Sequence, residues 1–317
     1  MKIAIMGNLH DDGLKFLKNN NCEILQISNF NEEYLKNKLL DVDGIIIRTA
    51  TLSANTLSGC KNLKIISRHG VGYDNIDTNY IEKNKIALGI TGTANAVSVA
   101  EHVMTMFLYL AKKIYISNEL TKSGKFDERN NIPDFFELYN KNILIIGFGR
   151  IGKEVAKRCN GFDANVYVYD PYISNNEIKK MNCYSINKEK GLEIADYITI
   201  HLPLNEKTKN FISYDQFKKF KKDLILVNTA RGGIINEDAL YIALKEKNIG
   251  GAGLDVFNNE PPITNHPLFS LENIILTPHN AALTLECRKR MSIESCENVY
   301  YYLTKNINLN KKNIIIN

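Results

Sequence analysis

The sequence has no segment that would carry it into or across a membrane. No stretch approaches the roughly 18 consecutive apolar residues that a transmembrane helix needs. The apolar start, Met1–Gly7, is too short for a secretory signal peptide. We therefore expect a cytoplasmic protein without a membrane partner.

Cysteine is present without any of its usual binding or cross-linking patterns. The six cysteines include no Cys-x-x-Cys pair and match no zinc-ligand spacing. A chain of 317 residues is also long enough to fold without a disulfide framework. These absences predict reduced thiols and no metal site.

A concentrated basic surface is missing as well. The formal net charge is only +5, and lysine is spread along the chain, often beside asparagine. Nucleic-acid binding requires basic residues that cluster on one face, so no nucleic-acid partner is expected. A mildly positive field is still compatible with an anionic small-molecule substrate.

What the sequence does contain is an alternation of short apolar runs and helical patterns. Hydrophobic residues make up 44% and charged residues 24% of the chain, the balance of a globular protein, and the length suits two domains. Near-continuous apolar, β-branched runs are typical of parallel strands that helices cover on both faces. The predicted strands are Lys2–Met6, Gly44–Ile47, Leu63–Ser67, Ile86–Ile90, Asn142–Ile146, Asn165–Tyr169, Tyr197–Ile200, Leu224–Val227, Gly251–Leu254 and Ile274–Leu276. They fall into two sets, which predicts an α/β protein with two doubly wound parallel-sheet domains.

Other segments connect and end these sets. A long helical pattern covers Ala94–Lys113, and a final helix covers about Thr284–Leu303. Residues 114–140 are more polar and contain a glycine and a proline, which predicts an irregular connection. The Asn- and Lys-rich end, Lys305–Asn317, is interpreted as a tail or a last edge segment.

A glycine-rich turn follows the predicted strand Asn142–Ile146. It reads Gly147-Phe148-Gly149-Arg150-Ile151-Gly152 and opens a helical pattern over Ile151–Cys159. Without a Cβ, the first glycine permits a tight turn, the second lets a pyrophosphate approach the backbone, and the third lets helix and strand pack closely. The helix N-terminus then offers N–H groups and a favourable dipole to the anion. The alternative is a tight turn without a ligand, but the strand and helix on either side favour a dinucleotide site.

The end of the next predicted strand supplies the residue that selects the dinucleotide. Asp170 lies about 20 residues after the turn, where an acid accepts hydrogen bonds from the ribose hydroxyls. Its charge repels a 2′-phosphate, and neither Pro171 nor Tyr172 offers a cation to bind one. NAD is therefore predicted in preference to NADP. The first strand ends in Met6–His10, which has a single glycine and is not expected to bind a dinucleotide.

Candidate chemistry lies in segments that leave three later strands: Val227–Gly233, Leu254–Pro261 and Leu276–Ala282. The ligand crevice of an open α/β sheet lies at the carboxyl ends of its strands, so all three point to the nicotinamide end of the cofactor. Arg231 can bind a carboxylate with two parallel hydrogen bonds. His279 can pass a proton to a carbonyl oxygen while Glu260 orients the imidazole. Taken singly, Arg231 is also compatible with a surface charge, Glu260 with a loop charge and His279 with a structural histidine.

Further motifs extend the pattern over most of the chain: Arg68–Asp77, Ala94–His102 and His201-Leu202-Pro203. With the glycine turn and the three segments above, they make the chain similar to the D-isomer-specific 2-hydroxyacid dehydrogenase family. The resemblance implies reversible hydride transfer between NAD and a 2-hydroxy or 2-keto acid. Tyr169–Ser174 resembles the 3-phosphoglycerate dehydrogenases of serine biosynthesis, and hydroxypyruvate or glyoxylate reductase is the alternative. A non-catalytic NAD sensor, similar to the family's transcriptional corepressors, is the alternative of another class.

The resemblance also implies a role for each residue of the site. Arg231 would bind the substrate carboxylate, His279 would be the acid/base, and Glu260 would pair with it. Backbone around Val71 and Gly72 would help to hold the carboxylate beside Arg231 and His279. The implied cofactor contacts are Gly147, Gly149, Arg150, Ile151, Gly152, Asp170, His201, Leu202, Pro203, Thr208, Thr229, Ala230, Asp255 and His279.

The family's architecture implies a substrate domain built from both ends of the chain. Residues 1–94 and 285–317 would form a flavodoxin-like substrate domain, and residues 95–284 a Rossmann NAD-binding domain inserted into it. A homodimer through the NAD-binding domain is expected. A phosphorylated substrate would require a further cation, for which Arg48 and Arg68 are candidates. The chain stops before the regulatory domain of long phosphoglycerate dehydrogenases, so control through that domain is not expected. Formate dehydrogenases are also relatives, but a longer N-terminal region is expected to set them apart.

Overall fold

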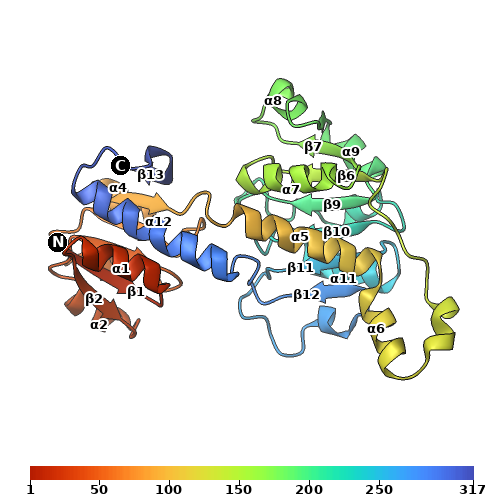
Figure 1. Ribbon diagram of the computed structural model, residues 1–317, viewed down its shortest axis with the longest axis horizontal. Helices are drawn as coiled ribbons and strands as arrows, with labels where there is room; N and C mark the ends of the chain where they lie inside the picture. Colours follow the sequence, from red (N-terminus) through yellow and green to blue (C-terminus); the bar gives the residue numbers. More distant parts are fainter. The chain divides into compact units, whose positions relative to one another are not determined.

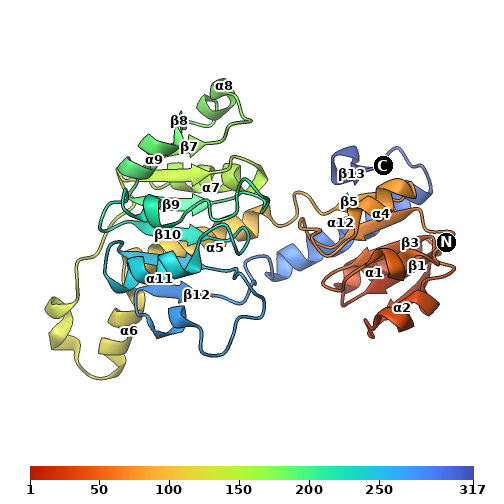
Figure 2. The same ribbon diagram turned by 180° about the vertical axis from the view of Figure 1, so that it is seen from behind.

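The computed structural model describes all residues, 1–317, and they form two compact units. Unit 1 consists of Met1–Asn95 and Ala282–Asn317, and unit 2 consists of Ala96–Ala281 (Figure 1). The chain thus enters unit 2 once and leaves it once, which Figure 2 shows from behind. No helix in either unit is both long and apolar enough to cross a membrane.

Unit 1 is built on a six-stranded sheet. Its strands are β1 Lys2–Met6, β2 Glu23–Ile27, β3 Gly44–Ile47, β4 Ile65–Arg68, β5 Ala87–Ile90 and β13 Ile314–Ile316. Its helices are α1 Asp11–Asn19, α2 Glu32–Lys38, α3 Ala54–Leu57, α4 Thr78–Lys83 and α12 Leu285–Leu303, with the 3-10 turn η3 Lys311–Asn313. The strand order is β13-β5-β4-β3-β1-β2, and only β13 runs antiparallel to its neighbour.

Unit 2 is built on a seven-stranded sheet in which every neighbouring pair is parallel. Its strands are β6 Asn142–Ile146, β7 Asn165–Tyr169, β8 Tyr184–Ser185, β9 Tyr197–Ile200, β10 Ile225–Asn228, β11 Gly251–Leu254 and β12 Ile274–Leu276. Its helices are α5 Ala96–Ala111, α6 Ile114–Lys122, α7 Arg150–Asn160, α8 Asn175–Lys179, α9 Lys188–Ile194, α10 Tyr214–Phe217 and α11 Glu237–Lys245, with the 3-10 turns η1 Phe126–Asn131 and η2 Pro267–Ser270. The strand order is β12-β11-β10-β9-β6-β7-β8.

Each sheet separates two hydrophobic cores. In β6, Ile143 and Ile145 pack into the cluster that holds residues of α5 and α7. Leu144 and Ile146 pack into the cluster that holds residues of α9 and α11. Because successive side chains of a strand point to opposite faces, helices cover this sheet on both sides. The residues of β1 alternate between two clusters in the same way.

The predicted α/β class with two parallel-sheet units is confirmed, and most predicted strands lie close to the observed ones. Two strands were not identified from the sequence. In β2 only the last residue is fully buried, and both residues of β8 are exposed, so neither shows a continuous apolar run. The C-terminal segment is an edge strand, β13, that pairs with β5.

The predicted irregular connection over residues 114–140 is wrong in its first half. That region contains α6 and η1, and neither of them has a buried residue. Without a core-facing stripe, the sequence carries no helical periodicity to detect. In both ribbon views, α6 and the turn after it extend away from the sheet of unit 2 (Figures 1 and 2).

Candidate functional site

The glycine turn after β6 has a backbone that only glycine accommodates at two positions. Gly147 has a φ of +94°, and a Cβ added there would lie 2.6 Å from the carbonyl oxygen of His201. A Cβ added to Gly152 would lie 2.2 Å from the carbonyl oxygen of Gly147, so α7 packs directly on the turn. At Gly149, by contrast, an added Cβ meets nothing within 4 Å. The turn is therefore closely packed underneath and open above, as a backbone cradle for a phosphate group requires.

The N-terminus of α7 has an N-cap residue without a side chain. Its N-cap residue is Gly149, which makes no side-chain cap hydrogen bond, and the first turn contains no acidic residue. Arg150 and Ile151 form the start of that turn. N–H groups that lack an intrahelical acceptor and the helix dipole together favour an anion at a helix N-terminus of this kind.

Asp170 lies at the end of β7 and shapes the glycine turn directly. Its Oδ2 accepts a hydrogen bond from the Phe148 N–H at 2.7 Å, and its Oδ1 accepts one from the Tyr172 N–H at 2.9 Å. A carboxylate has about four lone-pair sites, so capacity remains for ribose hydroxyls. The structure therefore gives Asp170 a second task that its position in the sequence did not reveal.

The segment after β9 lies beside the turn mainly through its backbone. His201 is half-buried, its Nε2 lies 3.0 Å from Thr199 Oγ1, and desolvation of the ring lowers its pKa to about 3. This histidine is therefore neutral, and its carbonyl lies against Gly147. Leu202 and Pro203 continue the segment, and Thr208 Oγ1 donates to the Pro203 carbonyl at 2.6 Å. Their predicted contacts with the cofactor stay predictions.

Arg231 is presented by a loop that Asn228, the last residue of β10, holds in shape. Asn228 Nδ2 donates to the Arg231 carbonyl at 2.8 Å, and its Oδ1 accepts from the Ala230 N–H at 3.0 Å. Between them, Thr229 is nearly buried and its Oγ1 has no hydrogen-bond partner. A buried hydroxyl without a partner at the carboxyl edge of the sheet fits a polar group of a bound ligand.

The Arg231 loop and the Glu260 loop pack against each other through backbone. A Cβ added to Gly232 would lie 1.8 Å from the carbonyl oxygen of Phe257 and 2.6 Å from the amide nitrogen of Asn258. No side chain larger than hydrogen fits there without moving one loop. The positions of Arg231 and Glu260 are thus mechanically linked.

Asp255 is buried at the end of β11 and holds the His279 loop. Its Oδ1 accepts from Thr277 Oγ1 at 2.6 Å and from the Asn280 N–H at 2.9 Å, and its Oδ2 accepts from the Ala281 N–H at 3.0 Å. His102 Nε2 lies 3.0 Å from the same Thr277 hydroxyl. These contacts of Asp255 are structural, and its predicted nicotinamide contact stays a prediction.

Glu260 and His279 form the central pair of the site. His279 Nδ1 lies 2.7 Å from Glu260 Oε2, and Glu260 Oε1 accepts the Phe257 N–H at 3.1 Å. A carboxylate accepts hydrogen bonds only, so Nδ1 carries the proton and Nε2 faces away from Glu260. His279 has a φ of +50°, a sparsely populated conformation that the surrounding loop must stabilise. Its side chain is 53% exposed, which leaves Nε2 open to a substrate.

The substrate residues predicted in unit 1 lie after β4. Val71 and Gly72 are half-buried in the loop that follows His69. His69 itself is buried, and its pKa is lowered to about 4 by burial and by the charges of Arg48 and Arg68. Two guanidinium groups and a neutral imidazole therefore meet at the carboxyl edge of this sheet.

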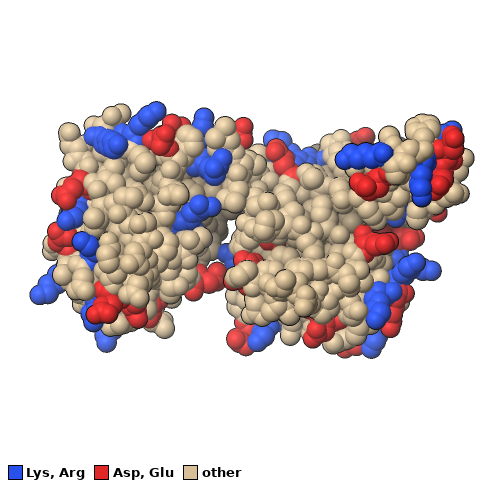
Figure 3. All heavy atoms as spheres, turned by 90° about the horizontal axis from the view of Figure 1, so that it is seen from below, with Lys and Arg blue, Asp and Glu red and all other residues tan.

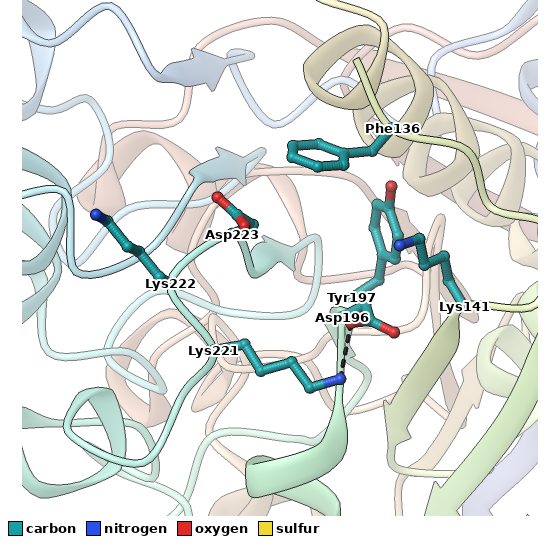
Figure 4. A pocket seen from close by; sticks show the side chains of 7 residues that line it. All are labelled: Phe136, Lys141, Asp196, Tyr197, Lys221, Lys222 and Asp223. Carbon is teal, nitrogen blue, oxygen red and sulfur yellow. Dashed lines mark hydrogen bonds and ion pairs between the residues drawn. The ribbon is translucent and has the colours of Figure 1, made fainter. Parts of the chain in front are cut away.

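A small cavity of about 120 Å³ lies in unit 2 away from all these residues. It is lined by Phe136, Lys141, Asp196, Tyr197, Lys221, Lys222 and Asp223 (Figure 4). Asp196 binds the Lys221 ammonium at 2.8 Å and caps the start of β6. Because its lining comes from the amino ends of the strands, it lies at the sheet edge opposite the glycine turn. Basic residues are dispersed among acidic ones on the face of the molecule in Figure 3, without a dense basic patch there.

Two residues that support the site were not identified from the sequence. Asn228 had an available signal, because it is a polar residue at the end of an apolar strand. Glu237 had no such signal, because its hydrogen-bond partners, Asn258 and His266, lie more than 20 residues away in the sequence.

Comparisons with known proteins identify the family of the chain. Residues 104–281, more than half of the chain, match the family model described as D-isomer specific 2-hydroxyacid dehydrogenase, NAD binding domain. A D-3-phosphoglycerate dehydrogenase of Methanocaldococcus jannaschii is 38% identical over 91% of this chain and 55% of its own length. A hydroxypyruvate reductase of Thermotoga maritima is 38% identical over 82% of this chain and 84% of its own length. The chain spans about half the length of the curated phosphoglycerate dehydrogenases that it matches.

A solved structure covers the whole chain. The NAD-dependent formate dehydrogenase of Staphylococcus aureus in complex with NAD superposes with a TM-score of 0.85 at 30% identity, over 100% of this chain and 99% of that chain. The expected longer N-terminal region therefore does not separate this formate dehydrogenase from the chain. The family model and the relatives together show that the chain belongs to the D-isomer-specific 2-hydroxyacid dehydrogenase family of NAD-dependent oxidoreductases, and that unit 2 carries the family's NAD-binding domain.

Proposed function

We propose that the protein interconverts a 2-hydroxy acid and a 2-keto acid with NAD as the hydride carrier. The Glu260–His279 pair, with 2.7 Å between Oε2 and Nδ1, is the observation that carries the proposal. Its loop packs against the loop of Arg231 at Gly232. A carboxylate-held imidazole and a guanidinium on adjoining loops fit a substrate that has a carboxylate beside a carbonyl.

In this proposal each residue acts on one group of the substrate. Arg231 binds the carboxylate and fixes the neighbouring carbon. Bound NAD(H) supplies or accepts the hydride at that carbon. In reduction, His279 Nε2 gives its proton to the carbonyl oxygen; in oxidation, it takes the proton of the hydroxyl. Glu260 fixes the imidazole orientation through Nδ1 and stabilises its charged form.

The residues present fit NAD. Gly149 leaves room above the turn, α7 has an uncapped N-terminus, and Thr229 Oγ1 is a buried polar atom without a partner. Asp170 favours free ribose hydroxyls over a 2′-phosphate, because its negative charge repels the phosphate.

Two observations separate the candidate substrates. The Arg48 side chain is half-buried directly after β3 and makes no hydrogen bond or ion pair within the chain, which favours a substrate with a second anionic group such as 3-phosphoglycerate. The match to the Thermotoga maritima hydroxypyruvate reductase covers 84% of that enzyme, which favours hydroxypyruvate or glyoxylate. Formate is disfavoured, because its oxidation to carbon dioxide releases no proton from oxygen and gives the Glu260–His279 pair no task.

The first experiment is an NADH-oxidation screen against phosphohydroxypyruvate, hydroxypyruvate, glyoxylate and pyruvate. We expect turnover with at least one of them. The variants Arg231→Ala and His279→Ala should each lower kcat/KM at least about 1,000-fold while NADH still binds. Lys218→Ala, which removes an exposed cation elsewhere in unit 2, is the matched control. Turnover of Arg231→Ala or His279→Ala close to that of the unmodified protein would refute the proposed roles, and inactivity with all four acids would favour the NAD-sensor alternative.

The homodimer belongs to this proposal as well. The region after α5 exposes large apolar side chains, including Ile114 at 51%, Phe126 at 58% and Tyr139 at 57%. A second copy of unit 2 would cover them, since exposed apolar surface that is contiguous marks an interface. A measurement of the molecular mass in solution tests the homodimer. Location in the cytoplasm stays a prediction.

A further inference from the structure

Glu260 lies in a loop that the hydrophobic core hardly holds. Between β11 and η2, residues 258–266 are exposed or half-exposed, and Ile263 at the loop centre is 64% exposed. Segments with few buried apolar contacts open easily, so polar contacts must fix such a loop if a side chain in it is to keep one position. The loop nevertheless carries the carboxylate that orients His279.

We propose that Glu237 is a positioning residue for the Glu260–His279 pair. This inference rests on the proposed function, because it names what holds that pair in place. Glu237 is the first residue of α11, and its side chain is only 12% exposed. Its Oε1 accepts the Asn258 N–H at 2.7 Å, and its Oε2 lies 3.1 Å from His266 Nε2. The two carboxylate oxygens thus bind the loop on either side of Glu260.

The tautomer of His266 is fixed by its second contact. The Leu268 N–H donates to His266 Nδ1 at 3.3 Å, so Nδ1 is an acceptor and Nε2 carries the hydrogen. Nε2 therefore donates to Glu237 Oε2. The ring also packs against Phe257 and Phe269, with centroids 6.2 and 5.4 Å away. Glu237 thereby connects the start of the loop, through Asn258, to its end, through His266.

The anchor itself is rigid. Glu237 lies in the first turn of α11, where the helix dipole stabilises a carboxylate. The helix is capped by Asn236, whose side chain accepts the Ala239 N–H, and it buries Ala239 and Leu240. The Gly232 backbone also packs directly against Phe257 and Asn258, which restricts movement of the loop there. The loop is therefore held between α11 and the Arg231 loop at the point where it leads into Glu260.

The variants Glu237→Gln and Glu237→Ala test the contact chemistry. A carboxamide has one oxygen and one NH2 group, so it can accept from Asn258 but then presents a donor to His266 Nε2–H. Asp238→Asn is the matched control, because it removes an exposed charge from the same helical turn. We expect Glu237→Ala to lower kcat about 10- to 100-fold, since a misplacement of about 1 Å has an effect of that size. KM for the keto acid should stay within about twofold, because Arg231 keeps its own loop.

A double-mutant cycle separates positioning from a general loss of structure. In a Glu260→Gln background the pair is already impaired, so adding Glu237→Ala should change kcat by less than about threefold. An undiminished 10- to 100-fold loss in that background would overturn the proposal. So would a kcat of Glu237→Ala equal to that of Asp238→Asn.

Hydrogen exchange keeps the inference distinct from the proposed function. The Asn258 amide should exchange at least about 10-fold faster in Glu237→Ala than in Asp238→Asn, because it loses its acceptor. An unchanged rate contradicts the contact and overturns the inference. If the unmodified protein reduces no keto acid, the proposed function fails, and the inference that Glu237 positions a catalytic pair fails with it even where exchange confirms the contact.

Discussion

Both units place their first strand inside the sheet and beside their second strand, but they differ in the turn that follows the first one. In unit 1, β1 lies between β2 and β3; in unit 2, β6 lies between β7 and β9. Both turns begin with a glycine of positive φ, +110° at Gly7 and +94° at Gly147. A first strand in this place and a following glycine of positive φ therefore do not by themselves make a dinucleotide site.

The difference lies at the start of the helix. In α1, His10 Nδ1 accepts the Asp12 N–H at 3.3 Å, and two aspartates occupy the first turn. In α7, no side chain caps the N-terminus and no acid is present. A helix N-terminus becomes an anion site only where the chain leaves its N–H groups unfilled and the local charge does not oppose the ligand. Unit 1 fails both conditions, and unit 2 meets both.

A later glycine in each turn region is equally crowded but serves a different contact. An added Cβ at Gly13 would lie 2.3 Å from Ser292 Oγ, because α12 packs closely on α1. An added Cβ at Gly152 would lie 2.2 Å from the Gly147 carbonyl, within the cofactor turn. In unit 1 the small residue stabilises helix packing, and in unit 2 it shapes the cradle.

The largest expected effect comes from filling these two positions. Gly152→Ala should weaken NADH binding at least about 100-fold, because the turn must move and several charge-assisted hydrogen bonds to the pyrophosphate are lost. Gly13→Ala should lower the unfolding temperature of unit 1 while unit 2 still binds NADH. Fluorescence titration and calorimetry measure the two properties. Equal loss of NADH affinity in both variants would show that the comparison assigns the wrong unit.

A smaller effect is expected at the end of the second strand, where only unit 2 has an acid. β2 ends in Ile27, and β7 is followed by Asp170. Asp170→Ala should lower the ratio of kcat/KM for NADH to that for NADPH about 10- to 100-fold, the value of one or two hydrogen bonds to a charged group and the lost repulsion. Asp215→Ala, which removes an exposed carboxylate elsewhere in unit 2, should leave the ratio unchanged. An unaltered ratio in Asp170→Ala would mean that another residue selects the cofactor.

The parts of the molecule that the sequence predicted are those with a local or periodic signal. Strands buried on both faces appear as apolar runs, and the glycine turn appears as a spacing. Arg231, Glu260 and His279 could be selected as candidates because each lies in a segment that follows such a strand. β2 and α6 were not, because partial exposure removes the pattern that distinguishes an element from a connection.

The contacts that support the candidate site could not be predicted from the sequence for another physical reason. Glu237 and Asn258 are 21 positions apart, and their hydrogen bond exists only because α11 and the Glu260 loop lie side by side after folding. The hydrogen bond of Asp170 to Phe148 is of the same kind. A single sequence indicates which residues lie at the strand ends, but the distances among those ends follow from the packing of the sheet.

The smallest expected effect concerns one histidine of lowered pKa in each unit, His69 and His201. Burial lowers the pKa of His69 to about 4 and that of His201 to about 3, against an unfolded value near 6.5. Below pH 6.5 the unfolded chain therefore binds more protons than the folded one, so stability falls as the pH falls. Each histidine should lower the free energy of unfolding by about 2 kcal/mol between pH 7 and pH 5. This corresponds to a fall of about 4–8 °C in the unfolding temperature. His69→Asn should reduce the acid-induced loss of stability in unit 1, and His201→Asn should reduce it in unit 2. Calorimetry at the two pH values measures the loss as a difference. Taking the difference cancels any constant effect of the substitution. An acid-induced loss as large in both variants as in the unmodified protein would show that carboxylates, rather than these histidines, set the acid stability of the two units.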